Sequence, residues 1–400
     1  MGAVNVAQPV GTASEAALDY PRIGVISAGH LLNDLYSNLL IALMPYFVLQ
    51  GKISATMAGL ILLVYLLGSS ILQPLFGLLA DHSGLRLFAI IGPLWVGIGA
   101  CLTGWAPDTR ALFALAAFSS IGSAAFHPQA ASMVNGMSPR QKGWTMSLFS
   151  MGGNIGFAFG PVLAAGVAVI GLRWSPLALL PGIVLTLLLA RFAPRTSRRQ
   201  SGSALEGVRG ITRRVWGTLS LVIAVIATRS GTQYCLIIFL PLLYHARGSS
   251  AELGSIYAFV LSLSGALGGL LGGSLSDRYG QKLVVVSTLV AAVPLLALAL
   301  TVHGPLVWPL LIWAGAALLA SNSLTVVQGQ QLLPGSMGVA SGLTLGLAFG
   351  LSGVIASAFT ALSDHVGIAT AVHLLPALPL MAAILAVFVP AHDRLTVAGM

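Results

Sequence analysis

Two ionisable residues stand inside long apolar runs of the sequence. Of the ten acidic residues, Asp34 alone lies inside such a run, and of the nineteen lysines and arginines, Arg229 alone does. Because burying a charge in apolar surroundings is costly, charged residues at such places usually handle protons or substrates. Asp34 is therefore predicted to carry a proton, and Arg229 is predicted to bind an anionic substrate.

Histidines and amides add hydrogen-bonding groups to the same runs. His30 precedes Asp34 by one helical turn, so both side chains share a face and His30 can share or tune the proton. His127 stands beside a helix-breaking proline in F-H-P-Q-A (126–130), and Asn322 takes the corresponding place later in the chain. Two ligands on one helix fall short of a metal-binding set, so neither a metal nor a cofactor is expected. The predicted substrate-binding residues are Asn33, His127, Gln129, Arg229, Gln233, Tyr234 and Asn322.

The composition explains why apolar runs dominate the chain. Charged residues make up 7 % of the 400 positions and hydrophobic residues 56 %. Soluble domains carry roughly a quarter charged residues, so these few charges could not cover a water-soluble surface. A spanning helix needs ~20 apolar residues, which predicts an all-α integral membrane protein with about 12 transmembrane helices. The predicted spans lie near 22–50, 54–80, 87–106, 110–136, 144–168, 175–193, 215–243, 255–276, 283–303, 306–332, 338–362 and 370–390.

The spans fall into two sets of six, separated by a basic Arg-, Ser- and Gly-rich linker over 194–214. Residue types repeat across this linker at an offset of 196 positions. A parallel repeat of this kind predicts two pseudo-symmetric six-helix halves around a central site. The repeated pairs are Pro45 with Pro241, Gly77 with Gly273, Asp81 with Asp277, Gly84 with Gly280, and Arg86 with Lys282. The predicted units are a tail over 1–21, halves over 22–193 and 215–390, the linker, and a tail over 391–400.

The distribution of basic residues predicts the orientation. An even number of spans puts both tails on the linker's side, where fourteen lysines and arginines fall, against four on the opposite side. The positive-inside rule then predicts an inner (plasma) membrane protein with cytoplasmic termini. The net charge of +9 comes from these short segments, which favours the lipid bilayer over nucleic acid as a partner. The acidic residues other than Asp34 are assigned to loops, termini or the linker.

Two interpretations of Asp34 and Arg229 stay open. At the offset of 196, Arg229 corresponds to Asn33, the neighbour of Asp34, so the acid and the base occupy pseudo-equivalent places. They either form an ion pair that bridges the halves, or act separately on a proton and an anionic substrate. Protonation of Asp34 is expected to weaken any attraction between the two and to leave Arg229 free for the substrate.

A charged segment that occurs once in each half has a known relative. G-L-L-A-D-H-S-G-L-R (77–86) and G-S-L-S-D-R-Y-G-Q-K (273–282) both resemble the major facilitator signature G-x-x-x-D-R-x-G-R-R, with His82 replacing the usual base in the first copy. A generic charged loop is the alternative interpretation. The resemblance implies gating of a conformational change, and no contact with substrate, for Gly77, Asp81, Gly84, Arg86, Gly273, Asp277, Arg278, Gly280 and Lys282.

A glycine series in the fifth predicted span indicates close helix packing. Gly152, Gly156 and Gly160 recur at four-residue spacing and are followed by Pro161, which makes a smooth face for a neighbouring helix. The segment G-G-N-I-G-F-A-F-G-P resembles the antiporter motif of drug/proton exchangers in the same superfamily. Plain packing and a role in exchange both remain open.

Longer segments resemble one family within this superfamily, the fosmidomycin-resistance family. They include G-H-L-L-N-D-L-Y, G-S-A-A-F-H-P-Q-A, S-L-F-S-M-G-G-N-I-G-F-A-F-G-P and Q-L-L-P-G-S-M-G-V-A-S-G-L, and the resemblance covers about 22–390. It implies proton-driven efflux of small polar, often anionic, compounds such as phosphonate antibiotics. His30, Asn33, Asp34 and His127 match its signatures, whereas Gln129 replaces the family's usual glutamate and leaves Asp34 with more of the proton coupling.

The predicted function is therefore a proton-coupled efflux antiporter that works by alternating access, as a monomer. No G-x-x-x-x-G-K-[ST] segment occurs, so no ATP site is expected. A proton-coupled importer of an organic anion or sugar is the alternative. A membrane-embedded enzyme is a more remote one, because His30 and Asp34 are too few groups for an enzyme site.

Overall fold

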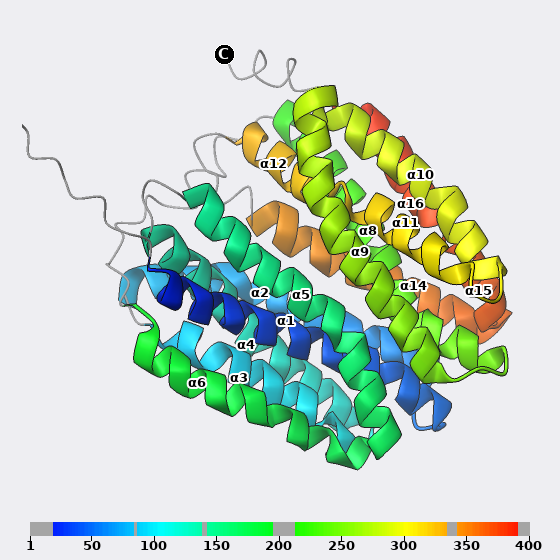
Figure 1. Ribbon diagram of the computed structural model, residues 1–400, viewed down its shortest axis with the longest axis horizontal. Coiled ribbons are helices and arrows are strands. Elements are labelled where there is room, and N and C mark those ends of the chain that lie inside the picture. The colour runs from blue at the N-terminus through cyan, green and yellow to red at the C-terminus, as the bar shows by residue number, and fades with distance from the viewer. Residues whose placement is uncertain (1–18, 84–85, 138–141, 195–212, 334–341, 391–400) are drawn as a thin grey trace, which may run out of the picture.

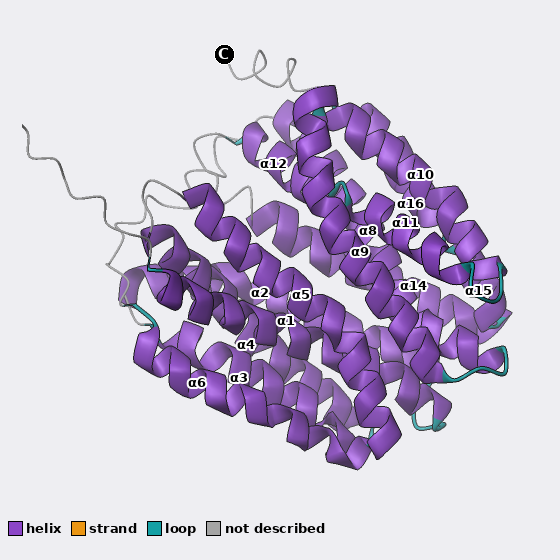
Figure 2. Ribbon diagram, in the orientation of Figure 1, coloured by secondary structure: helices purple, strands orange, loops and turns teal. Residues whose placement is uncertain are grey.

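The computed structural model describes residues 19–83, 86–137, 142–194, 213–333 and 342–390, and all regular elements in them are helices (Figure 2). Twelve helical segments in this part of the chain are long and apolar enough to cross a membrane. The all-α fold and the number of spans predicted from the sequence are thus confirmed. The tails over 1–18 and 391–400 and most of the predicted linker lie outside the described residues.

The first half contains six spans, some of them built from two helical pieces. They are α1 (Tyr20–Leu49), α2 (Ala55–Ser83), α3 (Leu87–Cys101) with a 3₁₀ turn Leu102–Trp105, α4 (Thr109–Met137), α5 (Lys142–Ile170), and a 3₁₀ segment Leu172–Leu179 leading into α6 (Leu180–Phe192). Prolines lie inside several of these helices, for example Pro74 in α2 and Pro93 in α3. Membrane helices accommodate them because neighbouring helices and small local adjustments satisfy the freed backbone groups.

The second half repeats this arrangement. Its elements are α8 (Arg213–Ala246), α9 (Ala251–Tyr279), α10 (Gln281–Thr301), α11 (Val307–Leu319) with α12 (Asn322–Leu332), a π-helical turn Gly342–Leu347 leading into α14 (Ala348–Val366), and α15 (Ile368–Leu374) with α16 (Ala377–Phe388). The tenth span, predicted as continuous, is interrupted between α11 and α12. Asn322 begins the second piece directly after the interruption.

The repeat extends from residue types to helix boundaries. Helices α2 and α9 begin and end 196 positions apart, and so do the last residues of α6 and α16. Gly171 and Gly367, also 196 apart, follow α5 and α14 with φ of 103° and 83°. Side chains other than hydrogen are strained in this left-handed region, so glycine is required at both turns. Equivalent backbone positions in the two halves thus end equivalent spans.

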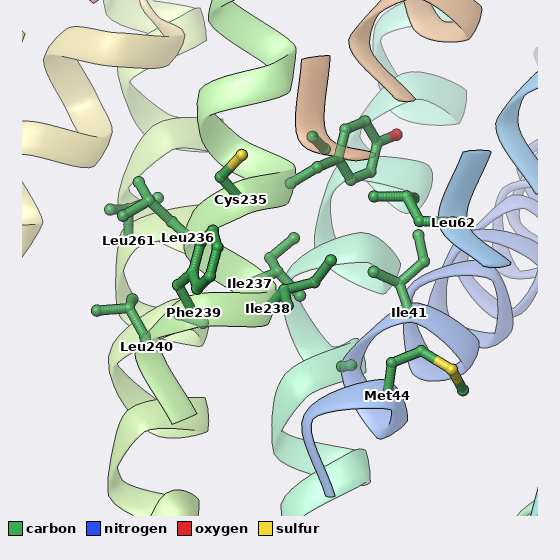
Figure 3. Packing of buried hydrophobic residues seen from close by; sticks show 14 of the residues in the cluster. Ile41, Met44, Leu62, Cys235, Leu236, Ile237, Ile238, Phe239, Leu240 and Leu261 are labelled. Carbon is green, nitrogen blue, oxygen red and sulfur yellow. The ribbon is translucent and has the colours of Figure 1, made fainter. Parts of the chain in front are cut away.

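Three pairs of helices join the two halves: α1 with α8, α2 with α14, and α5 with α9 (Figure 1). A continuous apolar cluster fills the part of this interface near the ends of α1 and α8 farthest from the linker. Figure 3 shows Ile41 and Met44 of α1, Leu62 of α2 and Ile237 and Ile238 of α8 in this cluster. Residues 39–44 and 235–240 are all at most 1 % exposed. The halves are therefore sealed together at this end.

Hydrogen bonds join the halves at the same end. The hydroxyl groups of Tyr46 and Ser255 lie 2.8 Å apart, and both residues are buried. Asp364 Oδ2 accepts hydrogen bonds from the backbone N–H and the hydroxyl of Thr56, at 2.9 and 2.6 Å. The sequence-based assignment of Asp364 to a loop is wrong, because α14 continues to Val366 and carries the carboxylate on its last turn. Glu252 and Asp277 likewise belong to the end turns of α9, where a charge still reaches the membrane surface from a helical position.

Candidate functional site

Asp34, midway along α1, is the centre of a polar cluster. Its Oδ2 lies 3.3 Å from Nε2 of His30, one turn earlier on α1, and its Oδ1 lies 3.2 Å from Nε2 of His127 on α4. Asn33 donates a hydrogen bond from Nδ2 to the same Oδ1 at 3.0 Å. The shared face of His30 and Asp34 is as predicted, and the fold brings His127 to the same carboxylate.

Backbone carbonyls fix the orientation of both imidazoles. His30 Nδ1 lies 2.8 Å from the carbonyl oxygen of Phe149 on α5, and His127 Nδ1 lies 2.8 Å from that of Ser123 on α4. A carbonyl oxygen only accepts, so each Nδ1 must carry the hydrogen. In a neutral imidazole the other nitrogen, Nε2, then presents a lone pair. Both Nε2 atoms lie within 3.3 Å of the carboxylate of Asp34, so a proton or another cation is needed to join these acceptors.

The cluster is open to small species although it lies at mid-helix. The side chains of Asp34 and His127 are 21 % and 28 % exposed, and that of His30 is 11 % exposed. The His30 ring stacks on the ring of Phe149, with centroids 4.1 Å apart, which covers one side of it. The open side of the cluster is therefore formed by Asp34 and His127.

Helix α5 passes the cluster at a glycine. A Cβ atom at Gly153 would lie 2.5 Å from His30 Nε2 and 2.8 Å from Asp34 Oδ2, closer than normal contacts allow. Its neighbours in the predicted packing series hold α5 against α1: a Cβ at Gly152, Gly156 or Gly160 would strike α1 at Ser27, Leu31 or Asn38, respectively. Glycine at these places allows the close approach that aligns the Phe149 carbonyl with His30.

Arg229 of α8 is buried without a counter-charge among the described residues. It is 1 % exposed, and its Nη2 donates to Asn322 Oδ1 at 2.9 Å and to Ser230 Oγ at 3.1 Å. Its Nε has no hydrogen-bond partner. Within the described ranges no carboxylate lies within ion-pair distance of the guanidinium. A buried cation of this kind leaves hydrogen-bonding capacity for an anion.

Asp34 and Arg229 belong to separate sites in this conformation. The carboxylate faces the two histidines, whereas the guanidinium faces Asn322 of α12. Tyr234, on α8 and 7 % exposed, is close enough to interact electrostatically with both charged groups, and its ring lies 5.9 Å from that of Phe157 on α5. An ion pair bridging the halves is thus not formed in this conformation.

The remaining predicted substrate residues divide between the site and the scaffold. Gln233 is half-buried on α8, and Asn33 is buried against Asp34. Gln129 is fully buried, and its Oε1 accepts the backbone N–H of Ala89 at 2.7 Å. Ala89 lies in the first turn of α3, where N–H groups lack helical partners. Because residues two positions apart on a helix point to different sides, Gln129 faces α3 while His127 faces Asp34. This placement does not support the predicted contact of Gln129 with substrate.

The paired signature segments attach helix ends within each half. Arg86 donates from Nη1 to the carbonyl of Ala193 after α6, at 2.7 Å, and Lys282 donates from Nζ to the carbonyl of Val387 in α16, at 2.6 Å. A cation at a helix C-terminus satisfies free carbonyls and the helix dipole. Gly280 has φ of 84° between α9 and α10, and Asp277 and Arg278 are exposed. Gly77 and Gly273 lie near the ends of α2 and α9, whereas Gly84 and the side chain of Asp81 lie outside the described residues.

Sequence analysis missed several residues that shape the site. Ser123 and Phe149 act through backbone carbonyls, which no side-chain pattern reveals. Gly153 differs from the other glycines of its segment only in breaking the four-residue spacing, and the Gly-Gly pair at 152–153 was an available signal. Asp364 could have been noticed as an acid close to the end of an apolar run.

Comparisons with known proteins agree with this architecture. The sequence profile of the Major Facilitator Superfamily matches residues 26–357. The chain is 30 % identical over 395 residues to the MFS-type transporter YfnC of Bacillus subtilis, with 94 % of each chain covered. It is 29 % identical over 394 residues to the fosmidomycin resistance protein of Escherichia coli K12, with 96 % of each covered. A bacterial homologue of the human lysosomal transporter Spinster, solved in an inward-facing and unoccupied conformation, superposes with a TM-score of 0.77 at 17 % identity, covering 95 % of this chain and 98 % of that one.

Proposed function

Since the chain belongs to the major facilitator superfamily and is a membrane transporter rather than an enzyme, we propose that it exchanges protons for a small polar or anionic compound. The exchange is an efflux antiport driven by the proton gradient. It proceeds by alternating access, in which the two six-helix halves rock around the central site.

The observation that carries this proposal is the division of charge between the halves. The first half holds a carboxylate with two imidazoles, the groups that take up and release protons near neutral pH. The second half holds a buried guanidinium with an unpartnered Nε, a group that binds carboxylates and phosphonates through charge-assisted hydrogen bonds. Antiport needs both a proton site and a substrate site, and the two halves supply one each.

The substrate class follows from the buried cation and from the relatives. Arg229 with Asn322 offers donors and a positive charge to an anionic head group. The Escherichia coli relative is named for resistance to fosmidomycin, which supports a fosmidomycin-like compound or a chemically similar metabolite as the substrate. Tyr234 and Gln233 of α8 would contact the rest of the molecule.

The direction of access follows from where the halves are closed. The apolar cluster, the Tyr46–Ser255 contact and the Asp364–Thr56 contact all lie at the end farthest from the linker. With this end closed, access to the central site is proposed to come from the linker side. In a bacterial inner membrane, the basic linker and both termini would lie on the cytoplasmic side. This is then the state that loads substrate from the cytoplasm. The transporter is proposed to work as a monomer, with its central site formed between the two halves of one chain.

Proton movement in everted vesicles tests the proposal. Vesicles containing the full chain are energised and then challenged with fosmidomycin and a panel of small organic anions, while the pH of the lumen is followed. Substrate-evoked release of protons from the lumen, absent in Asp34→Asn, is the expected result. Coupled transport that survives Asp34→Asn would exclude Asp34 as the carrier. Substrate entry that acidifies the lumen would instead indicate that protons and substrate move in the same direction. Such a symporter would act as an importer in the cell.

A further inference from the structure

We propose that His30, Asp34 and His127 form a binding site for one divalent transition-metal ion. The site uses the same three groups as the proposed proton site. The inference goes beyond that function, because metal binding at equilibrium requires neither a substrate nor a proton gradient. Two of the ligands lie on α1 and the third on α4.

The orientation of both imidazoles is preset. Each imidazole gives its Nδ1–H to a backbone carbonyl 2.8 Å away, at Phe149 for His30 and at Ser123 for His127. Histidine ligands of metal ions usually have this arrangement, which fixes the tautomer and raises the basicity of the coordinating nitrogen. Both Nε2 atoms thus lie beside the carboxylate of Asp34, one near each of its oxygens, before any ion binds.

The donor atoms are closely spaced. The three ligand atoms lie within 4.8 Å of one another, with His30 Nε2 at 3.3 Å from Oδ2 of Asp34 and His127 Nε2 at 3.2 Å from its Oδ1. Ligands about 2.0–2.1 Å from a tetrahedral zinc ion stand roughly 3.3–3.4 Å apart. The two nitrogen–oxygen distances are near this value, and rotation of the side chains would bring the three donors around one ion.

Helix α5 passes the cluster without a side chain. A Cβ at Gly153 would lie 2.5 Å from His30 Nε2 and 2.8 Å from Asp34 Oδ2, so any residue larger than glycine at this position would displace both ligand atoms. Asp34 and His127 keep 21 % and 28 % of their side-chain surface exposed, which leaves a coordination position for water or a further ligand. Three protein ligands with one open position describe an exchangeable site, whereas structural zinc sites are closed by four.

The donor types select the class of metal. Two imidazoles and one carboxylate suit Zn²⁺, Co²⁺, Ni²⁺ or Cu²⁺, whereas Mg²⁺ and Ca²⁺ prefer sets made of oxygen atoms. The two cysteines, Cys101 and Cys235, are both buried in the apolar core away from this cluster. The site is therefore assigned to nitrogen and oxygen ligands only.

Titration with Co²⁺ tests the inference, because the visible absorption of this ion reports its coordination. The full chain, purified in detergent without a histidine tag, is titrated at pH 7.5. One Co²⁺ per chain is expected, displaced by Zn²⁺ and not by Mg²⁺. X-ray absorption of the zinc form should show imidazole ligands at ~2.0–2.1 Å and no sulfur at ~2.3 Å. No binding, or sulfur ligation, would overturn the assignment.

Variants separate this cluster from the other histidines. His127→Ala and Asp34→Asn should weaken Co²⁺ binding at least ~100-fold, because each removes a ligand. Gly153→Ala keeps all three ligands but places a methyl group against the ligand atoms of His30 and Asp34, and it should weaken binding as well. His245→Ala and His303→Ala change exposed histidines elsewhere and should bind as the unaltered chain does. Equal binding by all these variants would place the ion on surface histidines and overturn the proposal.

Two features keep the outcome clear. Each variant is checked for folding by its thermal unfolding, and a ligand variant that does not fold is replaced by Gly153→Ala, which alters no ligand. Binding is measured without a membrane gradient, so a failure to bind metal leaves the proposed proton exchange untouched. A loss of coupled transport with metal binding retained would refute the proposed function alone.

Discussion

The two halves of this protein share a backbone plan but treat buried charge in opposite ways. In the first half, Asp34 is surrounded by His30, His127 and Asn33, and both of its oxygens have polar neighbours. In the second half, Arg229 has two neutral neighbours and an unpartnered Nε. This difference supports the proposal that the first site holds a small cation and the second an anion.

This contrast shows how a duplicated fold acquires two functions. The helix ends and the turns with left-handed glycines repeat at 196 positions, so the two halves provide equivalent frames. Asn33 and Arg229 occupy equivalent positions in those frames. A single difference of residue type at one symmetric place therefore separates a neutral neighbour of the proposed proton site from the centre of the proposed anion site.

The largest expected effect comes from removing the charge of the first site. Asp34→Asn keeps the shape of the side chain but removes the negative charge between the two imidazoles, so proton-driven transport should be lost completely. Substrate exchange without a gradient should remain, because the anion site is in the other half. Proton release from everted vesicles and substrate counterflow measure the two activities. Loss of both proton release and counterflow would mean that proton binding and substrate binding are not separated between the two halves.

Arg229 should affect substrate binding and leave proton binding intact. Arg229→Gln removes charge-assisted hydrogen bonds worth about 1.5–3 kcal/mol, which corresponds to a KM increase of roughly 10- to 150-fold. Arg229→Lys keeps the charge and should recover part of the affinity. Radiolabelled uptake in vesicles measures the KM. A KM within threefold of the original would remove Arg229 from the substrate site.

The unfolding temperatures of variants at the two charged residues test the contrast between the halves in another way. Arg229→Met replaces an unpaired buried charge by an apolar side chain, so the unfolding temperature in detergent should stay equal or rise. Its matched partner, Asp34→Leu, leaves two imidazoles facing an apolar group and should lower it. A strongly destabilised Arg229→Met would show that the guanidinium is part of the scaffold.

A smaller effect is expected where the halves touch each other. Asp364→Ala removes two hydrogen bonds from Thr56 between α14 and α2, at an exposed place where the pair contributes about 1 kcal/mol. The ratio of the two access states should shift roughly fivefold toward opening at this end. Spin-label distances across α2 and α14 report the shift, with Glu252→Ala as a control on a helix end without this contact. An unchanged distance distribution would show that the apolar cluster alone keeps this end closed.

The smallest effect is expected from Ser123→Ala. The hydroxyl of Ser123 lies 3.4 Å from His127 Nδ1, whereas the backbone carbonyl of the same residue lies at 2.8 Å and remains in the variant. Transport and its pH profile should change less than about twofold, since a bond at this length is weak. A tenfold loss would mean that the hydroxyl, and not the carbonyl, orients the imidazole.

Much of the fold could be predicted from the residue pattern. Twelve spans, two halves and the 196-residue repeat follow from hydropathy and from repeated glycines, prolines and charges, and the structure confirms the span count and the symmetric helix ends. The interruption of the tenth span and the helical position of Asp364 were not predicted. Hydropathy averages over a span, so it cannot register a local break or a polar last turn.

The sequence predicted the residues of the site better than it predicted which of them contact one another. The pairing of His30 with Asp34 is a matter of one helical turn and was predicted from their spacing. The contact of His127 with Asp34, the bond between Arg229 and Asn322, and the separation of Arg229 from Asp34 depend on which helices lie side by side. Gln129 illustrates the limit, because its type suggested a binding role and its orientation places it against α3.

The sequence by itself determined that this chain has about twelve membrane-spanning segments in two repeated halves, and it predicted that Asp34 and Arg229 are the charged residues within those spans. These properties depend on composition and on spacing along one helix, which a linear pattern contains. Only the tertiary structure decided that two imidazoles meet one carboxylate, that α5 passes them closely at Gly153, and that Arg229 has no counter-charge among the described residues. The physical reason is that such relations join atoms of helices far apart in the chain, and their distances and hydrogen-bond directions are fixed by packing.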